Sequence, residues 1–288
     1  MITEKTPARP EFAVSPRRQI PVFVLTLETA QSRRAPLLAQ LRKLGLEHEL
    51  FFGVDGRTGL PSQYEPLIDR SARVNNIRRP MTDGEYACAL SHLFIHRQIV
   101  ARGLPEAIIL EDDAIIGSYV ADLACGTIPM AGDLMLLDHQ GGFFRRWGKK
   151  QVTKELTAYR ISTAPDLTTG YVITRRAAER FLRDSFPVRY LADWPCRIDK
   201  MKSYAIHPRI VSHPDQQEGP SELRSERDSL NSAFAKNKLP KPGKIERLLT
   251  RVYWERKIQR RLHQRISSAV QLGQMKDVNC FYERKDVM

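Results

Sequence analysis

The stretch GLPEAIILEDDAIIG, Gly103 to Gly117, decides the fold because it places three acids at the end of a strand-forming run. The apolar residues around the acids are typical of a buried strand, whereas turns favour Gly, Pro, Asn and Ser around their acids. A carboxylate in an apolar setting is unfavourable unless a cation or hydrogen bonds compensate. We therefore expect Glu111, Asp112 and Asp113 to lie where a strand ends in a cleft.

The residues upstream of this strand predict a parallel sheet. Residues 21–27, PVFVLTL, are typical of a buried strand, and residues 32–45 predict a helix that begins at Ser32 as its N-cap. Residues 48–56, HELFFGVDG, predict a second strand. A strand, a helix and a strand in this order favour parallel pairing through a right-handed crossover.

A long helix is predicted directly before the acidic strand. Thr82 and Glu85 have capping-box spacing and Gly103 is a stop signal, so residues 82–103 should be helical. This helix leads into the strand that carries the acids, so the acids lie at a carboxyl strand end, where open α/β sheets bind ligands. Residues 168–184 predict a turn, a strand and a helix.

Composition indicates a globular, basic protein. The chain has 288 residues and 42% hydrophobic content, and its longest apolar runs fall short of the roughly 18 residues that span a bilayer. Four scattered cysteines without a C-x-x-C pair favour free thiols in the cytoplasm. From Lys236 onward there are fourteen Lys or Arg against five Asp or Glu, so most of the net charge of +13 lies in that segment.

The spacing of the acids suggests a metal site. Glu111 and Asp113 are two residues apart, so in an extended strand both carboxylates point to one side and Asp112 points to the other. Two carboxylates on one side offer hard oxygen ligands to Mg²⁺ or Mn²⁺, which would neutralise a diphosphate. A solvated acidic strand end is the alternative.

Several short motifs together resemble glycosyltransferase family 25, which includes bacterial lipooligosaccharide galactosyltransferases. The motifs are VLTL with RR, FFGVDG, GEYACALSH, AIILEDD and TTGYVITRRAAERFL, and the similar region covers about residues 20–225. The resemblance implies a GT-A fold, a UDP-sugar donor such as UDP-galactose, Mn²⁺ or Mg²⁺, and inversion at the anomeric carbon. We expect a flexible leader over residues 1–19, a catalytic domain over 20–235 and a basic helical extension over 236–288.

The resemblance implies roles around the metal. EDD resembles the Asp-x-Asp element of the GT-A fold, so Glu111 and Asp113 would bind the metal and Asp112 would face the ribose or the sugar. His213 would supply a late metal ligand, with a surface histidine before proline as the alternative.

The resemblance also implies donor contacts near the first two strands. Thr26 and Arg33 or Arg34 match the first-strand nucleotide contact, where a guanidinium would meet phosphate. Thr26 stands where the family pattern has Asn or Ser. Asp55 matches the acid that lines the uridine pocket, with a strand-ending turn residue as the alternative.

On the long helix, Ser91 and His92 match the family's SH pair beneath the donor, and a core histidine is the alternative for His92. Cys88, His92 and His96 share one helical face, which also suggests zinc. That interpretation is weaker, because HLFIH lacks the glutamate of H-E-x-x-H and a soft site would adjoin a hard one.

An inverting transfer needs a base for the acceptor hydroxyl. Asp193 resembles the family's late Asp, with a helix-start acid as the alternative and Asp138 as the reserve base. The TTGY motif suggests an acceptor surface made by Thr169, Gly170 and Tyr171.

The C-terminal extension predicts a basic amphipathic helix with Ile258, Leu262, Ile266 and Val270 at helical spacing. Such a helix can bind an anionic membrane surface, which would place a cytoplasmic enzyme on the inner face of the cytoplasmic membrane beside a lipid-linked acceptor. Packing of the apolar stripe onto the catalytic domain is the alternative.

Other protein classes fit parts of the pattern. A metal-dependent nucleotidyltransferase or phosphoesterase also uses paired acids. Nucleic-acid binding is less favoured, because the basic chain contains no recognised nucleic-acid-binding motif and, without a metal, the acid cluster would repel phosphate.

Overall fold

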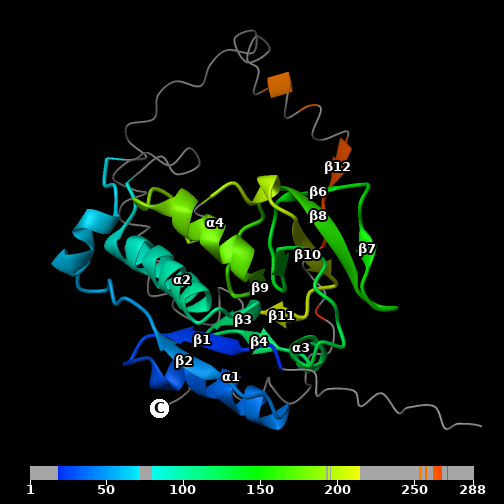
Figure 1. Cartoon of the computed structure of the whole chain (residues 1–288), viewed down its shortest axis with the longest axis horizontal. Coiled ribbons are helices and arrows are strands. Elements are labelled where there is room, and N and C mark those ends of the chain that lie inside the picture. The colour runs from blue at the N-terminus through cyan, green and yellow to red at the C-terminus, as the bar shows by residue number, and fades with distance from the viewer. Residues whose placement is uncertain are drawn as a thin grey trace, which may run out of the picture.

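A mixed β-sheet with helices on both faces forms the centre of the computed structural model, which describes residues 19–71, 80–192, 194, 196–214, 253–254, 257, 262–267 and 271 (Figure 1). The strands lie in the order β12-β6-β8-β10-β5-β9-β3-β1-β2, and β7 pairs with β8. Their bounds are β1 Val22–Thr26, β2 Glu49–Phe52, β3 Glu106–Glu111, β5 Leu134–Leu136, β6 Phe143–Arg145, β7 Lys150–Gln151, β8 Thr157–Thr163, β9 Gly170–Thr174, β10 Ser203–His207 and β12 His263–Gln264. A separate two-stranded sheet joins β4 Ile115–Ile116 to β11 Val211–Ser212.

The central strands confirm the expected α/β architecture. Strand β1 pairs in parallel with β2 and β3, and β5 pairs in parallel with β10. Strand β9 is antiparallel to both β3 and β5, so β2, β1, β3, β5 and β10 all run in one direction. Their carboxyl ends therefore meet at one edge of the sheet, in agreement with the GT-A architecture that the resemblance implies.

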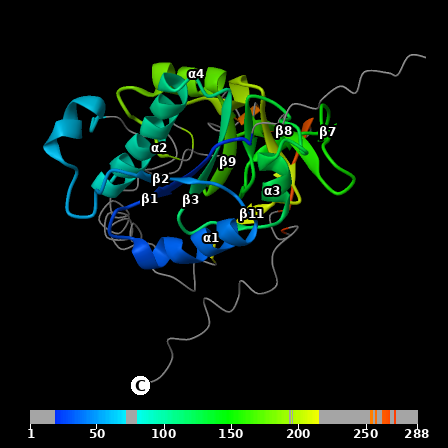
Figure 2. The same cartoon turned by 60° about the horizontal axis from the view of Figure 1, so that its bottom comes forward.

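The helices bury both faces of this sheet. They are α1 Gln31–Lys43, α2 Asp83–Ala101, α3 Tyr119–Ala124 and α4 Arg175–Ser185, with 3₁₀ turns η1 Ser62–Leu67 and η2 Ile198–Lys200. Figure 2 shows α2 and α4 on the face opposite α1. Alternate residues of β1 enter the two cores: Phe23 and Leu25 pack with α2 and α4, whereas Val22 and Val24 pack with α1 and α3.

Local signals explain where α2 and α1 begin. Thr82 Oγ1 accepts from the Glu85 N–H at 3.1 Å, and Glu85 Oε2 accepts from the Thr82 N–H at 2.9 Å, so the predicted capping box is confirmed. The prediction of Ser32 as the N-cap of α1 is wrong. That helix already includes Gln31, its N-cap is Ala30, and the Arg34 N–H donates to the Ala30 carbonyl at 3.2 Å.

Strand β3 ends earlier than the sequence suggests. Glu111 is its last residue, and Asp112 and Asp113 form a turn in which the Ala114 N–H donates to the Glu111 carbonyl at 3.0 Å. The expectation that Glu111 and Asp113 share one side of an extended strand is therefore wrong. The three acids nevertheless lie at the carboxyl end of β3.

The described part of the C-terminal extension does not form one continuous helix. His263 and Gln264 form β12, which pairs with β6, and Ile266 packs against the core beneath α2 and α4. This favours packing on the main domain for these residues, whereas Leu262 is exposed. Ile258 and Val270 lie outside the described residues, as do residues 1–18, so lipid binding by the extension stays a prediction. None of the described helices is both long and apolar enough to cross a membrane.

Candidate active site

One arginine holds the two acids that follow β3. Arg33 of α1 places Nε 2.9 Å from Asp112 Oδ1 and Nη2 2.7 Å from Asp113 Oδ2. Thr26, at the end of β1, donates its hydroxyl to Asp112 Oδ2 at 2.8 Å. Both oxygens of the buried Asp112 are therefore engaged by the protein, so the expected contact with a ribose or sugar is not open in this arrangement. Burial raises the pKa of Asp112 to about 6 although Arg33 opposes the shift.

Asp113 has an unmet oxygen. Its Oδ1 is buried and has no hydrogen-bond partner among the described residues, whereas Oδ2 accepts from Arg33. Burial raises the pKa of Asp113, and the charge of Glu111 adds to that increase while Arg33 opposes it. A buried acceptor without a donor costs about 1–3 kcal/mol. A bound cation would remove that cost, so this atom fits a metal ligand.

Glu111 is held by Thr168 and by His92 of α2. Its Oε1 accepts from the Thr168 hydroxyl at 2.6 Å and lies 3.1 Å from Nε2 of His92. Burial works against its charge, but these two hydrogen bonds and the nearby Arg33 outweigh burial and lower the pKa of Glu111. The carboxylate is therefore ionised at neutral pH, so His92 Nε2 carries a proton and donates to it.

A buried chain of hydrogen bonds continues from His92 into the core. The Tyr171 hydroxyl lies 2.9 Å from Nδ1 of His92 and 2.9 Å from Nε2 of His96. The three side chains are at most 3% exposed. Because a phenol has one proton, Tyr171 donates to one imidazole and accepts from the other. Burial lowers the pKa of His96 to about 3, so that ring is neutral. This chain fixes the orientation of His92 and thereby of Glu111.

Asp138 and His213 form a carboxylate–histidine pair. His213 Nδ1 lies 2.8 Å from Asp138 Oδ2, and Arg209 donates to Asp138 Oδ1 at 3.0 Å. The hydrogen bond that His213 donates to Asp138 raises the pKa of His213, and the charge of Asp113 makes a smaller contribution to the same shift. A histidine held at one nitrogen by a carboxylate presents its other nitrogen in a fixed direction, as metal-binding histidines do.

Ser91 and Asp55, which were predicted to contact the nucleotide-sugar donor, form hydrogen bonds with other residues of the protein. Ser91 is buried, donates to the Ala87 carbonyl at 2.7 Å and accepts from the Val54 N–H at 2.8 Å. A Cβ on Gly53 would lie 2.6 Å from Ser91 Oγ, so Gly53 allows the chain after β2 to pack onto α2. Ser91 therefore positions this segment from beneath. Asp55 is exposed and binds Arg57, whose Nε lies 2.9 Å from Asp55 Oδ1.

The three residues that were predicted to form an acceptor surface lie in the core. Thr169, Gly170 and Tyr171 are all buried, and Tyr171 packs edge-on against Trp194. The Tyr171 hydroxyl is occupied by the two histidines, so it acts from within the core and does not face an acceptor. Asp193 lies outside the described residues, and its proposed role as a base stays a prediction.

The residues that could bind zinc differ from the set that the sequence suggests. The ligand atoms of Cys88, His92 and Glu111 lie within 4.8 Å of one another, whereas His96 Nε2 contacts Tyr171. Both nitrogens of His92 already take part in hydrogen bonds, so zinc binding would have to break the chain described above.

Sequence analysis missed two residues of this site and gave a third, Tyr171, another role. Thr168 binds Glu111, Arg209 binds Asp138, and the Tyr171 hydroxyl joins the two histidines. Only Thr168 and Tyr171 carried a signal, because they belong to the TTGY motif.

Fold and site together define an α/β protein with an acidic, partly buried centre at the carboxyl edge of its sheet. A profile described as glycosyltransferase family 25 (LPS biosynthesis protein) matches residues 19–201. The chain belongs to glycosyltransferase family 25.

Individual relatives agree with this assignment. The chain is 29% identical over 182 residues to a glycosyltransferase 25 family member of Anopheles gambiae, a match that covers 57% of this chain and 28% of that protein. It is 35% identical over 170 residues to procollagen galactosyltransferase 1 of Danio rerio, covering 56% of this chain and 28% of that protein. The chain thus spans about a quarter of the length of these relatives.

Among solved structures, the galactosyltransferase LgtC in complex with donor and acceptor sugar analogues is similar with a TM-score of 0.36 and 12% identity. That match covers 77% of this chain and 98% of that one. At this TM-score the likeness adds nothing to the fold assignment, which rests on the sheet itself.

Proposed function

We propose that this chain is an inverting glycosyltransferase that moves a hexose, with galactose as the proposed sugar, from a UDP-sugar to a saccharide acceptor in lipopolysaccharide biosynthesis. Membership of family 25 and the galactosyltransferase named among its relatives support the reaction class. The description of the family as LPS biosynthesis proteins supports the acceptor class.

The observation that carries this proposal is the buried, unpartnered Oδ1 of Asp113 at the carboxyl edge of the sheet. His213, which Asp138 holds at Nδ1, interacts electrostatically with Asp113. Carboxylate and imidazole are ligands that Mn²⁺ accepts, so the residues present fit a divalent metal. Asp113 and His213 would hold the ion, with Glu111 oriented beside them. Such an ion supplies positive charge that neutralises a diphosphate leaving group.

The chain's own residues supply the remaining functions. Arg33 neutralises Asp112 and Asp113 in the structure described, and a bound cation would take over that task. The Arg33 guanidinium would be suited to a donor phosphate, which it could hold through two parallel hydrogen bonds. Thr168 and His92 keep Glu111 ionised and in place.

Asp193 is proposed as the base that takes the proton from the acceptor hydroxyl as its oxygen attacks the sugar. Asp138, the reserve candidate, is 0% exposed, and both of its oxygens accept hydrogen bonds from Arg209, His213 and the His139 N–H. An acceptor hydroxyl has no path to that carboxylate in this arrangement. Asp138 therefore fits the support of His213 better than proton transfer.

The function is tested with a panel of UDP-sugars and Mn²⁺, scored by UDP release with and without a saccharide acceptor. We expect acceptor-dependent UDP release with one sugar preferred. Release of pyrophosphate from a nucleoside triphosphate would identify a nucleotidyltransferase instead, and metal-dependent cleavage of a phosphate ester alone would identify a phosphoesterase.

The metal ligands are tested separately by calorimetry. Asp113→Asn and His213→Ala should each weaken Mn²⁺-dependent UDP binding by about tenfold or more, since each removes a direct ligand. Asp122→Asn removes an exposed acid on α3 and serves as the matched control. Unchanged Mn²⁺–UDP affinity in folded Asp113→Asn protein would refute the metal assignment.

A further inference from the structure

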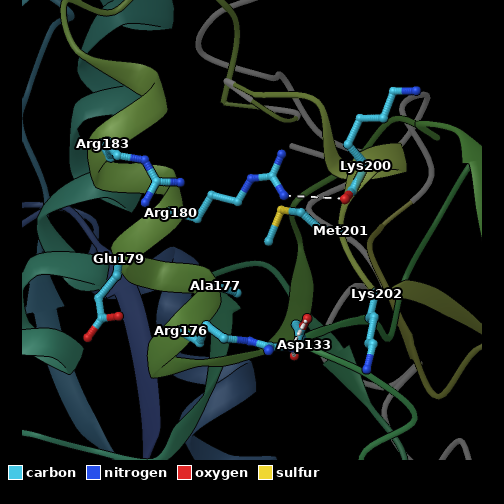
Figure 3. A pocket seen from close by; sticks show the side chains of 9 residues that line it. All are labelled: Asp133, Arg176, Ala177, Glu179, Arg180, Arg183, Lys200, Met201 and Lys202. Atoms are coloured by element: carbon cyan, nitrogen blue, oxygen red, sulfur yellow. Dashed lines mark hydrogen bonds and ion pairs between the residues drawn. The ribbon is translucent and has the colours of Figure 1, made fainter.

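A polar cavity lies away from the acids, between α4 and the segment that joins η2 to β10. Its volume is about 380 Å³. Figure 3 shows the lining side chains on α4 and on residues 200–202, with the side chains of Lys200 and Lys202 extending in opposite directions. The lining residues are Asp133, Arg176, Ala177, Glu179, Arg180, Arg183, Lys200, Met201 and Lys202.

Sheet register separates this pocket from the candidate active site. Thr174 of β9 pairs with Glu106, the first residue of β3, whereas Gly170 pairs with Leu110, next to the acids. Arg176 follows Thr174, so the pocket lies at the opposite edge of the sheet. At about 3.3 Å per residue, the two sites lie on the order of 15 Å apart along the strand.

The charge of the pocket is strongly positive. Five of its lining residues are cationic and two are acidic. Asp133 is already neutralised, because Arg176 Nη2 lies 2.6 Å from each of its oxygens. Glu179 pairs with Arg175 at 3.8 Å, and in Figure 3 its carboxylate points away from the lysines. Neither acid of the pocket therefore pairs with Lys200 or Lys202.

Lys200 and Lys202 are the cations available to a ligand. Both are exposed, and neither forms an ion pair with any residue that the structure describes. Arg180 and Arg183 share one acid, Asp184, at 3.2 and 3.0 Å. An anion between α4 and the two lysines would meet several cations from two segments of the chain.

The backbone that carries these lysines is fixed in place. The Asp133 N–H donates to the Lys202 carbonyl at 2.7 Å, and Arg180 donates to the Lys200 carbonyl at 3.3 Å (Figure 3). Gly132 permits this close approach, since a Cβ there would lie 2.1 Å from the Lys202 carbonyl oxygen. A preformed backbone lowers the ordering cost of binding.

We propose that this pocket binds a phosphate-bearing anion at a site separate from the transfer centre. Arginine presents planar pairs of donors and lysine a compact charge, and both recognise phosphate oxygens. The cavity has room for more than one phosphate group, so a diphosphate or a phosphorylated saccharide or lipid headgroup is the ligand class. The proposal does not depend on the proposed function.

The test uses the full chain without divalent metal and inorganic pyrophosphate as the probe in calorimetry. The double variant Lys200→Gln/Lys202→Gln should bind pyrophosphate about tenfold more weakly, because two charge-assisted contacts are lost. The double variant Arg42→Gln/Lys154→Gln removes the same charge from exposed positions outside the pocket and should change affinity less than about twofold. Melting temperatures verify that all variants are folded.

Vesicle co-sedimentation then identifies the source of the phosphate. If the pocket variant also loses binding to phosphatidic acid vesicles, but the control variant does not, the ligand is a lipid headgroup. If only pyrophosphate binding falls, the ligand is a soluble or saccharide phosphate. Equal affinity of both double variants for pyrophosphate would overturn the proposal, and so would loss of pyrophosphate binding in Arg33→Gln alone.

Discussion

The buried chain that joins His96, Tyr171, His92 and Glu111 makes Tyr171→Phe the most informative single substitution. It removes one oxygen atom and keeps the ring that packs against Trp194. Two hydrogen bonds of 2.9 Å disappear, one to each imidazole. Each histidine is then left with a buried nitrogen that has lost its partner.

The structure sets the size of the effect. An unsatisfied buried polar group costs about 1–3 kcal/mol, so two of them should lower the free energy of unfolding by roughly 2–6 kcal/mol. For a domain of this size, each kcal/mol changes the melting temperature by about 2–4 °C. Tyr171→Phe should therefore melt at a temperature at least about 4 °C below that of the wild type. Tyr159→Phe is the matched control, because its hydroxyl makes no hydrogen bond with the described residues.

Function supplies the second measurement for this variant. Without the hydrogen bonds from Tyr171, His92 can rotate away from Glu111. Metal-dependent UDP binding should therefore weaken in protein that is still folded at the assay temperature. Thermal melting and calorimetry on the same preparations make the test. A melting temperature within about 2 °C of the wild type would refute the buried hydrogen-bond network, because the loss of two buried hydrogen bonds should lower the melting temperature by more than that.

Three further predictions concern single residues. His96 is neutral in the folded protein with a pKa of about 3, against about 6.5 in the unfolded chain. The free energy of unfolding should therefore fall by up to about 1.4 kcal/mol per pH unit as the pH drops from 6.5 towards 3. In His96→Leu the free energy of unfolding should depend less steeply on pH over this range, and an equal slope would contradict this reasoning. Arg33→Gln removes the cation that competes for the acids, so calorimetry should show tighter binding of Mn²⁺ alone and about tenfold weaker UDP binding; weaker Mn²⁺ binding would argue against competition. Asp193→Asn should keep donor affinity and lose transfer by at least about 10²-fold, and full activity in this variant would remove Asp193 as the base.

Predictions from sequence were most accurate where short-range rules act. Capping-box spacing located α2, and apolar periodicity located β1 and β3, because these signals depend on neighbours within one turn or one strand. The predictions were least accurate at the ends of helices and strands. Asp112 and Asp113 lie beyond the end of β3 because a turn forms in which the Ala114 N–H donates to the Glu111 carbonyl, and strand propensity contains no information on that hydrogen bond.

The sequence by itself determined the α/β class, the family and the position of the acids at a strand's carboxyl end, since motifs and periodicity are local properties of the chain. Only the tertiary structure decided what each acid contacts. Arg33 lies 80 residues from Asp113, and Tyr171 lies 79 residues from His92, so their pairing depends on the order of strands in the sheet. The same long-range packing turned Tyr171 into the core and brought His213 beside Asp138, because burial of side chains is set by which elements become neighbours, a property that no single segment encodes.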